Sequence, residues 1–282
     1  MKKLLVLILL YPSLVFSQNL HMGFRFGLAN YQGDLQERRF TFNQAKWMGS
    51  IGVRYDLSEH FTARSFLSYG SIKAADAENK STTLQQRNFS FETRLKELEL
   101  SMQYNLFSLN DQWWTPYAFA GVAVFNFKSF ANDPSGNKTY LQPLSTEGQE
   151  FITGKENYKR TILAIPFGIG AEYALNEDMR VGLELGYRRT FTDYIDDVST
   201  NYVNAAQLLA ARGPLAVQMA YRGNSTYPAA GSLRGNEKNK DGYYFVQLTF
   251  IIRPYVDWYK RTSGISSFKK QKRVGCPGSK GM

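Results

Sequence analysis

The stretch LKELELSMQYNL, residues 95–106, decides the fold. From Leu98 onward every second side chain is apolar or aromatic, namely Leu98, Leu100, Met102, Tyr104 and Leu106. The alternate positions are polar, namely Glu97, Glu99, Ser101, Gln103 and Asn105. A period of two predicts a β-strand with one apolar and one polar face. Two carboxylates on one face are a poor filling for an ordinary core. The question is therefore whether each face contacts water, lipid or other protein side chains.

The first seventeen residues have the pattern of an export signal. Lys2 and Lys3 precede an apolar stretch over 4–10, and Val15 and Ser17 occupy small-residue cleavage positions. This pattern predicts a secretory signal peptide over 1–17 and an exported mature chain. Beyond this segment the sequence contains no run of eighteen or more apolar residues, so no transmembrane helix is predicted.

Composition narrows the possible partners and folds. A single cysteine in an exported chain excludes a disulfide scaffold. The net charge of +10 is concentrated in the last twenty-five residues, so it belongs to a tail rather than to the fold. We therefore expect no nucleic-acid partner.

The alternating pattern recurs along the chain and predicts eight strands. They cover 23–29, 50–57, 61–70, 89–106, 117–127, 163–175, 181–191 and 243–253. In the fourth, Phe89 and Phe91 stand in the opposite phase to Leu98, which predicts a bulge near Leu95 and Lys96.

The connections between these strands alternate strictly in length. Those at 58–60, 107–115 and 176–178 are short, and those at 30–47, 72–88, 131–159 and 192–241 are long and polar. This alternation is typical of an outer-membrane antiparallel β-barrel with short periplasmic turns and long extracellular loops. The sequence favours eight strands, although a further hairpin within 192–241 would give ten.

In such a barrel the apolar row faces lipid and the polar row faces inward. An eight-stranded barrel is filled by side chains, so we expect a charged plug and no channel. The predicted ion-pair network of the lumen is Arg25, Arg54, Asp56, Arg64, Glu97, Glu99, Glu172, Arg180, Glu184, Arg188 and Arg253.

Aromatic residues near both strand ends support the membrane interpretation. The expected periplasmic girdle is Tyr55, Tyr104, Trp114, Tyr117, Tyr173 and Tyr255, and the expected outer girdle is Tyr69, Phe89, Phe127, Tyr187 and Phe191. A soluble lipocalin-like barrel, with its apolar face inward, is the alternative. The loop asymmetry and the girdles favour the membrane barrel.

Few residues offer enzymatic chemistry. His21 and His60 are the two histidines, and neither lies where it could join a nucleophile at the outer rim. No Cys/His cluster suggests a metal, so we expect no enzyme and no cofactor. Asp193, Asp196 and Asp197 crowd hard oxygens together, as a calcium site would, but their spacing fits no EF-hand. We favour a loop-folding role, with Asp197 or Ser199 capping a short helix over 204–211.

After the predicted barrel, over 18–254, the chain ends in a basic segment, 255–282. An even number of strands places this tail in the periplasm, as either a solvated tail or a docking arm for a partner. Cys276 could cross-link to another chain. The candidate partner-binding residues are Trp258, Lys260, Arg261, Lys269, Lys270, Lys272, Arg273 and Cys276.

Several longer words resemble a known family. GLANYQGDL, RNFSFETRLKELELSMQYNL, PYAFAGVAVFNF, TDYIDDVST and DGYYFVQLTF resemble PorG-like outer-membrane barrels of the Bacteroidetes type IX secretion system, over roughly 22–253. The resemblance implies a non-enzymatic subunit that organises a periplasmic ring of the lipoprotein PorK and its partner PorN during secretion and gliding motility. The alternative is a stand-alone OmpA/OmpW-like barrel with a surface or solute-interacting role.

Overall fold

The computed structural model describes residues 19–36, 41, 43–176 and 178–253. The predicted signal peptide and the basic tail lie outside the described residues. No helix among the described residues is long and apolar enough to cross a membrane.

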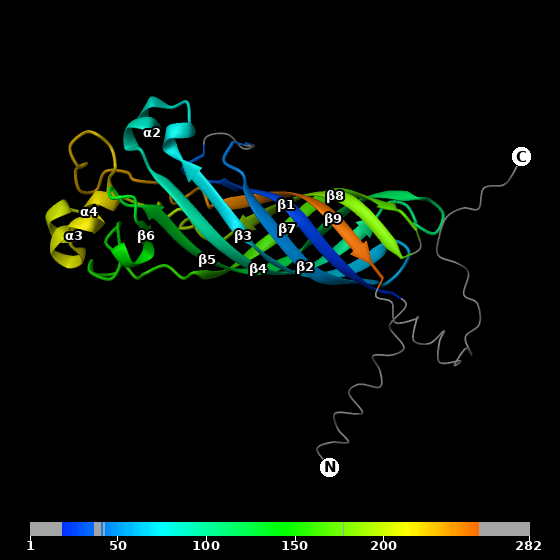
Figure 1. Ribbon diagram of the computed structural model, residues 1–282. Helices are drawn as coiled ribbons and strands as arrows, with labels where there is room; N and C mark the ends of the chain where they lie inside the picture. Colours follow the sequence, from blue (N-terminus) through cyan, green and yellow to red (C-terminus); the bar gives the residue numbers. More distant parts are fainter. Residues whose placement is uncertain (1–18, 37–40, 42, 177, 254–282) are drawn as a thin grey trace, which may run out of the picture.

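Eight long antiparallel strands close into a barrel (Figure 1). Their order around the barrel is β4-β3-β2-β1-β9-β8-β7-β5, and β5 pairs with β4 to close it. The strands are β1 (Leu20–Gln32), β2 (Lys46–Asp56), β3 (Phe61–Ala75), β4 (Ser90–Asn105), β5 (Trp114–Asn132), β7 (Thr161–Ala174), β8 (Met179–Thr190) and β9 (Gly242–Ile252). The prediction of an eight-stranded barrel is confirmed.

The connections separate the barrel into two ends. Short turns join β2 to β3, β4 to β5 and β7 to β8 at one end, and the long loops lie at the other end with the helices of the described residues (Figure 1). We call these the turn end and the loop end. The loops contain α2 (Thr82–Arg87), α3 (Ala205–Arg212), α4 (Pro214–Ala220), the 3-10 turns Asp76–Glu78 and Gln142–Leu144, and β6 (Lys138–Tyr140), which pairs with the end of β5. Segment 192–241 adds helices and one isolated bridge but no barrel strand.

The predicted bulge in β4 is absent. Pairing with β3 runs without interruption from Phe61 opposite Tyr104 to Ala75 opposite Ser90, and pairing with β5 is equally continuous. Phe91 and Leu95 are buried on the same inner face as Glu97 and Glu99. The apparent change of phase arises because the composition of the inner face changes, from apolar at the loop end to charged further along.

The outer surface of the turn-end half of the barrel is apolar. On β4, Leu98, Leu100, Met102 and Tyr104 are between 43% and 52% exposed, whereas Glu99 between them is fully buried. Soluble proteins rarely expose large contiguous apolar patches, whereas the hydrocarbon of a bilayer requires an apolar outer surface of a spanning barrel. The structure is therefore a transmembrane β-barrel, and the lipocalin-like alternative is wrong.

The girdle prediction is correct only in part. Tyr104, Trp114 and Tyr173 are exposed near the turn end, and Tyr69 and Phe191 are exposed further toward the loops. In contrast, three predicted girdle residues are buried, because they occupy the positions that point inward. These residues are Tyr117, Phe89 and Phe127. Tyr255 lies outside the described residues.

Candidate functional site

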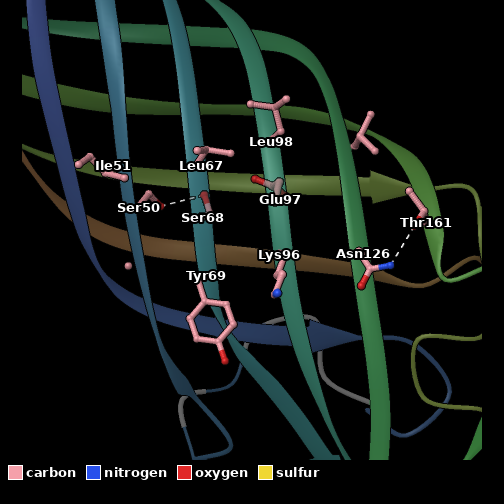
Figure 2. Close-up of a pocket in the computed structure, with 12 residues that line it drawn as sticks. Ser50, Ile51, Leu67, Ser68, Tyr69, Lys96, Glu97, Leu98, Asn126 and Thr161 are labelled. Carbon is pink, nitrogen blue, oxygen red and sulfur yellow. Dashed lines mark hydrogen bonds between the residues drawn. The ribbon is translucent and has the colours of Figure 1, made fainter.

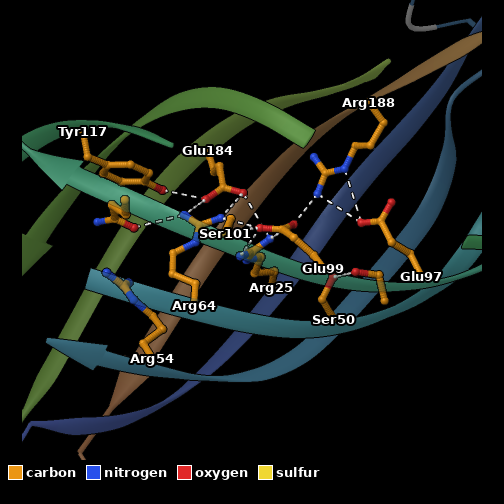
Figure 3. A network of polar contacts seen from close by, with 12 residues as sticks. Arg25, Ser50, Arg54, Arg64, Glu97, Glu99, Ser101, Tyr117, Glu184 and Arg188 are labelled. Atoms are coloured by element: carbon orange, nitrogen blue, oxygen red, sulfur yellow. Dashed lines mark hydrogen bonds and ion pairs between the residues drawn. The ribbon is translucent and has the colours of Figure 1, made fainter. Parts of the chain in front are cut away.

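Four charged side chains form a compact cluster in the lumen (Figure 3). Arg25 Nη1 of β1 lies 3.1 Å from Glu99 Oε2 and 3.2 Å from Glu184 Oε1. Arg64 of β3 contacts the other oxygens of the same two carboxylates, at 3.0 Å from Glu99 Oε1 and 2.8 Å from Glu184 Oε2. Each arginine therefore bridges both glutamates, and strands from opposite sides of the barrel are tied together across its axis.

Further pairs extend this cluster toward both ends. Arg188 Nη2 lies 2.6 Å from Glu99 Oε2 and 3.2 Å from Glu97 Oε1. Arg54 pairs with Glu172 at 2.6 Å, and Arg180 pairs with Asp56 at 3.0 Å near the turn end.

The lumen therefore holds five arginines and five carboxylates in mutual contact, so its formal charges balance. Removing ions from water is costly, and the cost is offset only when each ion is paired and hydrogen-bonded. The interlocked pairs meet that condition and fill the space that a solute would need.

Three of these arginines lie over the faces of aromatic rings. The Arg25 guanidinium carbon lies 3.3 Å from the ring centroid of Phe66, and Arg64 lies 4.1 Å from that of Phe119. Arg188 lies 4.1 Å from the ring of Phe245. A cation over an aromatic face is stabilised electrostatically, most strongly where water is excluded.

Glycine makes room for one of these rings. A Cβ atom at Gly23 would lie 2.7 Å from a ring carbon of Phe66, and one at Gly52 would lie 2.6 Å from another. These two lumen glycines are therefore needed for Phe66 to lie beneath Arg25.

Ten of the eleven residues predicted for the network lie in it. The exception is Arg253, which pairs at 3.5 Å with Asp178 in the turn after β7 and is partly exposed. It shares the inward phase but lies beyond the end of β9, where the lumen opens to solvent. For Arg253 the lumen prediction is wrong.

The predicted network omitted polar residues that complete it, although sequence analysis had placed one of them, Gln103, on the inward row. Tyr117 donates to Glu184 at 3.0 Å, Tyr243 donates to Glu97, and Gln103 donates to Glu172 at 3.1 Å. All three have the inward phase of their strands, and that phase is the signal that could have found them.

The loop end is closed by a folded cap, which we define as residues 133–160 and 191–241 together with 76–89. The segment TDYIDDVST, residues 192–200, folds down into the barrel mouth. Ile195 is fully buried, and its carbonyl accepts from the hydroxyls of Thr93 at 2.7 Å and Ser129 at 2.6 Å. On the loop-end side of the charged cluster, Ile195 belongs to an apolar core with Leu95, Phe127 and Phe245.

The three predicted loop aspartates are all buried in this cap. Asp196 and Asp241 both lie within hydrogen-bond distance of the Tyr31 hydroxyl, at 2.7 and 2.6 Å. Burial, together with the neighbouring negative charges, raises the pKa of Asp196 and of Asp241 well above the usual range. A hydroxyl donates only one hydrogen, so the second contact is satisfied when one of the two carboxylates carries a proton.

Asp197 joins a second ion-pair group. It accepts from Thr146 at 2.7 Å and Tyr158 at 2.8 Å, and Arg234 lies between it and Glu147, which Arg234 contacts at 2.8 Å. Burial raises the pKa of Asp197 to about 6, although Arg234 opposes the shift. Burial likewise raises the pKa of Asp193 to about 7.

These contacts support the loop-folding role rather than the calcium alternative. Within the described ranges, no three His, Cys, Asp or Glu side chains are grouped so that they could hold a metal ion. The expected helix is present as α3, but its cap is Asn204, whose side chain accepts from the amides of Ala206 and Gln207. The expectation that Asp197 or Ser199 caps it is wrong, because the helix begins only at Ala205.

The remaining candidate residues lie elsewhere. His21 and His60 lie at the turn end, where His21 Nδ1 is 3.6 Å from Asp56 Oδ2 and His60 Nδ1 is 2.9 Å from the Asn105 carbonyl. All the tail residues proposed for partner binding, from Trp258 to Cys276, lie outside the described residues.

A protein-family model with the description "Domain of unknown function (DUF6089)" matches residues 1–210. The chain belongs to this DUF6089 family. Among curated proteins none matches the sequence.

Solved structures similar to this DUF6089 chain include three β-barrel proteins. Neisserial surface protein A is 9% identical, with a TM-score of 0.42, and the match covers 83% of this chain and 97% of that one. The outer membrane protein OprG of Pseudomonas aeruginosa is 10% identical, with a TM-score of 0.40 and coverage of 83% and 96%. The N-terminal β-barrel domain of OprF from the same organism is 15% identical, with a TM-score of 0.35 and coverage of 83% and 98%.

Proposed function

We propose that this protein is a non-enzymatic, non-conducting barrel of the outer membrane, and that it serves as an anchoring subunit of a protein-secretion complex. The observation that carries the non-conducting part is the cluster of Arg25, Arg64, Glu99 and Glu184. Each arginine is held by two carboxylates across the barrel axis. Because removing either partner leaves an uncompensated buried charge, the cluster resists rearrangement into an open pore.

The cap adds a second seal above this cluster. Ile195 is fixed in the barrel mouth by two hydroxyl groups of the wall, and Arg234 ties the loop to Glu147. A barrel closed twice over is suited to holding other proteins at a membrane rather than to passing solutes.

The secretion assignment comes from the resemblance to PorG-like barrels of the type IX system. On this proposal the partners are a periplasmic ring lipoprotein and its companion, similar to PorK and PorN, besides the lipid bilayer itself. The basic segment 255–282 is the docking arm, and its cations and aromatic side chains make the contact.

Affinity purification from crosslinked membranes tests the secretion assignment. We expect the ring lipoprotein to co-purify with the full chain and to be lost when residues 255–282 are deleted. A variant of full length with all seven tail cations changed to glutamine, Lys280 included, separates charge from length. The matched control is Lys238→Gln/Lys240→Gln in the cap, which should retain the ring. Cys276→Ser tests whether a disulfide contributes.

Planar-bilayer recording tests the non-conducting part separately. The purified, refolded barrel should give no steady single-channel current. A reproducible conductance from the full chain would contradict the closed lumen and favour a solute-handling barrel.

One observation favours the stand-alone alternative, in which the barrel acts at the surface without a ring. The cap has a cleft of about 670 Å³ lined by amides and hydroxyls, from Thr82, Gln85, Gln86, Asn88, Asn224 and Ser225. Such groups suit a polar surface ligand. Purification of the full chain without any periplasmic partner, after crosslinking, would favour this alternative.

A further inference from the structure

The outer wall of the barrel is hollowed where its apolar surface ends (Figure 2). The hollow has a volume of about 850 Å³ and crosses β2, β3, β4, β5 and β7. We call it the wall groove. Most of its lining side chains point away from the lumen, so it opens toward the surroundings of the barrel.

Two adjacent rows of paired residues line the wall groove, and they differ in character. The row nearer the turn end is apolar: Ile51 pairs with Leu67, Leu67 with Leu98 and Leu98 with Val124. The row nearer the loop end is polar: Tyr69 pairs with Lys96, Lys96 with Asn126 and Asn126 with Thr161. The exposed lining of the groove is almost entirely apolar, and its polar side chains stand along the edge toward the cap.

Cations gather along this polar edge. Lys96 is exposed in the groove itself, and Arg94, Lys128 and Arg160 are exposed just beyond it. Lys128 and Arg160 also line a second hollow of about 230 Å³.

Unlike the arginines of the lumen, these four cations have no carboxylate partner among the described residues. Unpaired cations at a membrane interface attract anionic headgroups. The charge along the polar edge therefore favours an anionic ligand.

From this placement we propose that the wall groove binds one molecule of a phosphorylated, acylated glycolipid of the lipid A type. Its acyl chains lie against Leu67, Leu98 and Val124, and its phosphates lie against Lys96 and Lys128. The inference rests only on the membrane location of the barrel with its loop end outward, and not on the secretion role. A ligand with both an acyl chain and a phosphate satisfies both rows of the groove at once.

Native mass spectrometry of the full processed chain in detergent tests the phosphate contact. Diphosphorylated lipid A should bind about tenfold more tightly than its dephosphorylated form, because its anionic phosphates are attracted to the cations of the polar edge. The Lys96→Gln/Lys128→Gln variant should lose that difference. The matched control, Lys238→Gln/Lys240→Gln, removes the same charge from the cap and should keep it.

A second variant tests the apolar row. Val124→Trp fills the groove while keeping the surface apolar, and it should weaken binding of both lipid forms. Folding of every variant is checked by its heat-modifiable mobility in gels. Equal affinity for the two lipid A forms would overturn the proposal, as would binding of phosphatidylglycerol as tight as that of lipid A, or equal loss in the cap control. If only the ring co-purification fails, the groove proposal stands.

Discussion

The two halves of the barrel can be compared within β4 alone. Toward the turn end, Glu97 and Glu99 are buried inside while Leu98 and Leu100 are exposed outside. Toward the loop end, Thr93 and Leu95 are buried inside while Arg94 and Lys96 are exposed outside. The strand is continuous and its period is two throughout, yet polar and apolar faces exchange places within three residues.

The difference shows that backbone periodicity assigns residues to faces, whereas the medium decides the composition of each face. Where the outside is hydrocarbon, the outer face is apolar and the small lumen holds balanced charges. Where the outside is water, the same barrel has an ordinary apolar core, formed with Ile195 from the cap. Each half is stable only in its own surroundings, which gives direct ways to test the comparison.

The largest expected effect comes from the charged interior. Glu99→Gln removes one carboxylate that Arg25, Arg64 and Arg188 share. We expect the free energy of unfolding to fall by about 3–5 kcal/mol, because buried arginines are left uncompensated. Denaturant unfolding in lipid vesicles measures this loss.

Ser129→Ala, in the loop-end half of the barrel, is the control for removal of a buried polar group. It should lower the free energy of unfolding by only about 1–3 kcal/mol. An equal or smaller loss for Glu99→Gln would mean that the ion pairs do not hold the turn-end half together.

The next effect concerns the outer face. Leu100→Arg places a cation in the apolar row and should destabilise the barrel in vesicles by about 2–4 kcal/mol if that row spans hydrocarbon. The converse change, Arg94→Leu, lies two rows of paired residues beyond the apolar row of the groove, toward the loop end. It should alter stability by about 0.5 kcal/mol or less. Similar effects of the two substitutions would remove the boundary that β4 defines.

A smaller effect is expected at Ile195, which lies in the barrel mouth. Ile195→Val removes one methyl group from a fully buried side chain and should cost about 0.5–1.5 kcal/mol, mainly in the cap. Amide hydrogen exchange should then speed up in segment 192–200 and stay unchanged in strands of the turn-end half. Uniformly faster exchange would show that cap and barrel unfold as one unit.

Much of this architecture could be predicted from alternation and loop lengths. The phase of Leu98 and Glu99 placed the lumen charges correctly, and Arg188 met its glutamates as expected. The aromatic residues were harder: Tyr117 and Phe127 share one face of β5, but only pairing of Ala123 with Glu99 of β4 shows that this face is the lumen. A face that changes composition imitates a phase shift, and for that reason the bulge prediction was wrong.

The contacts of the cap could not be predicted from any local pattern. Tyr31 meets Asp196 and Asp241, which are 165 and 210 residues away in the sequence. The aspartate spacing within TDYIDDVST therefore indicated an unusual loop but not its partners. Only the closed barrel brings β1 and this loop to the same mouth.

The smallest effect is a pH dependence confined to the cap. Burial raises the pKa of Asp193 to about 7, whereas an aspartate in the unfolded chain has a pKa of ~3.9. The protonated carboxyl is thus the form that the folded cap favours, and its contribution to stability is lost as pH rises between these two values. Exchange of amides in 192–200, corrected for intrinsic rates, should therefore be slower at pH 5.5 than at pH 8. Asp193→Asn, which cannot ionise, should weaken this dependence without abolishing it, because the pKa values of Asp196, Asp197 and Asp241 are raised as well. Glu150→Gln, exposed in the same cap, should leave the dependence unchanged. Slower exchange at pH 8 would mean that a carboxylate at Asp193 is stabilised by the cap and would reverse the sign of this argument.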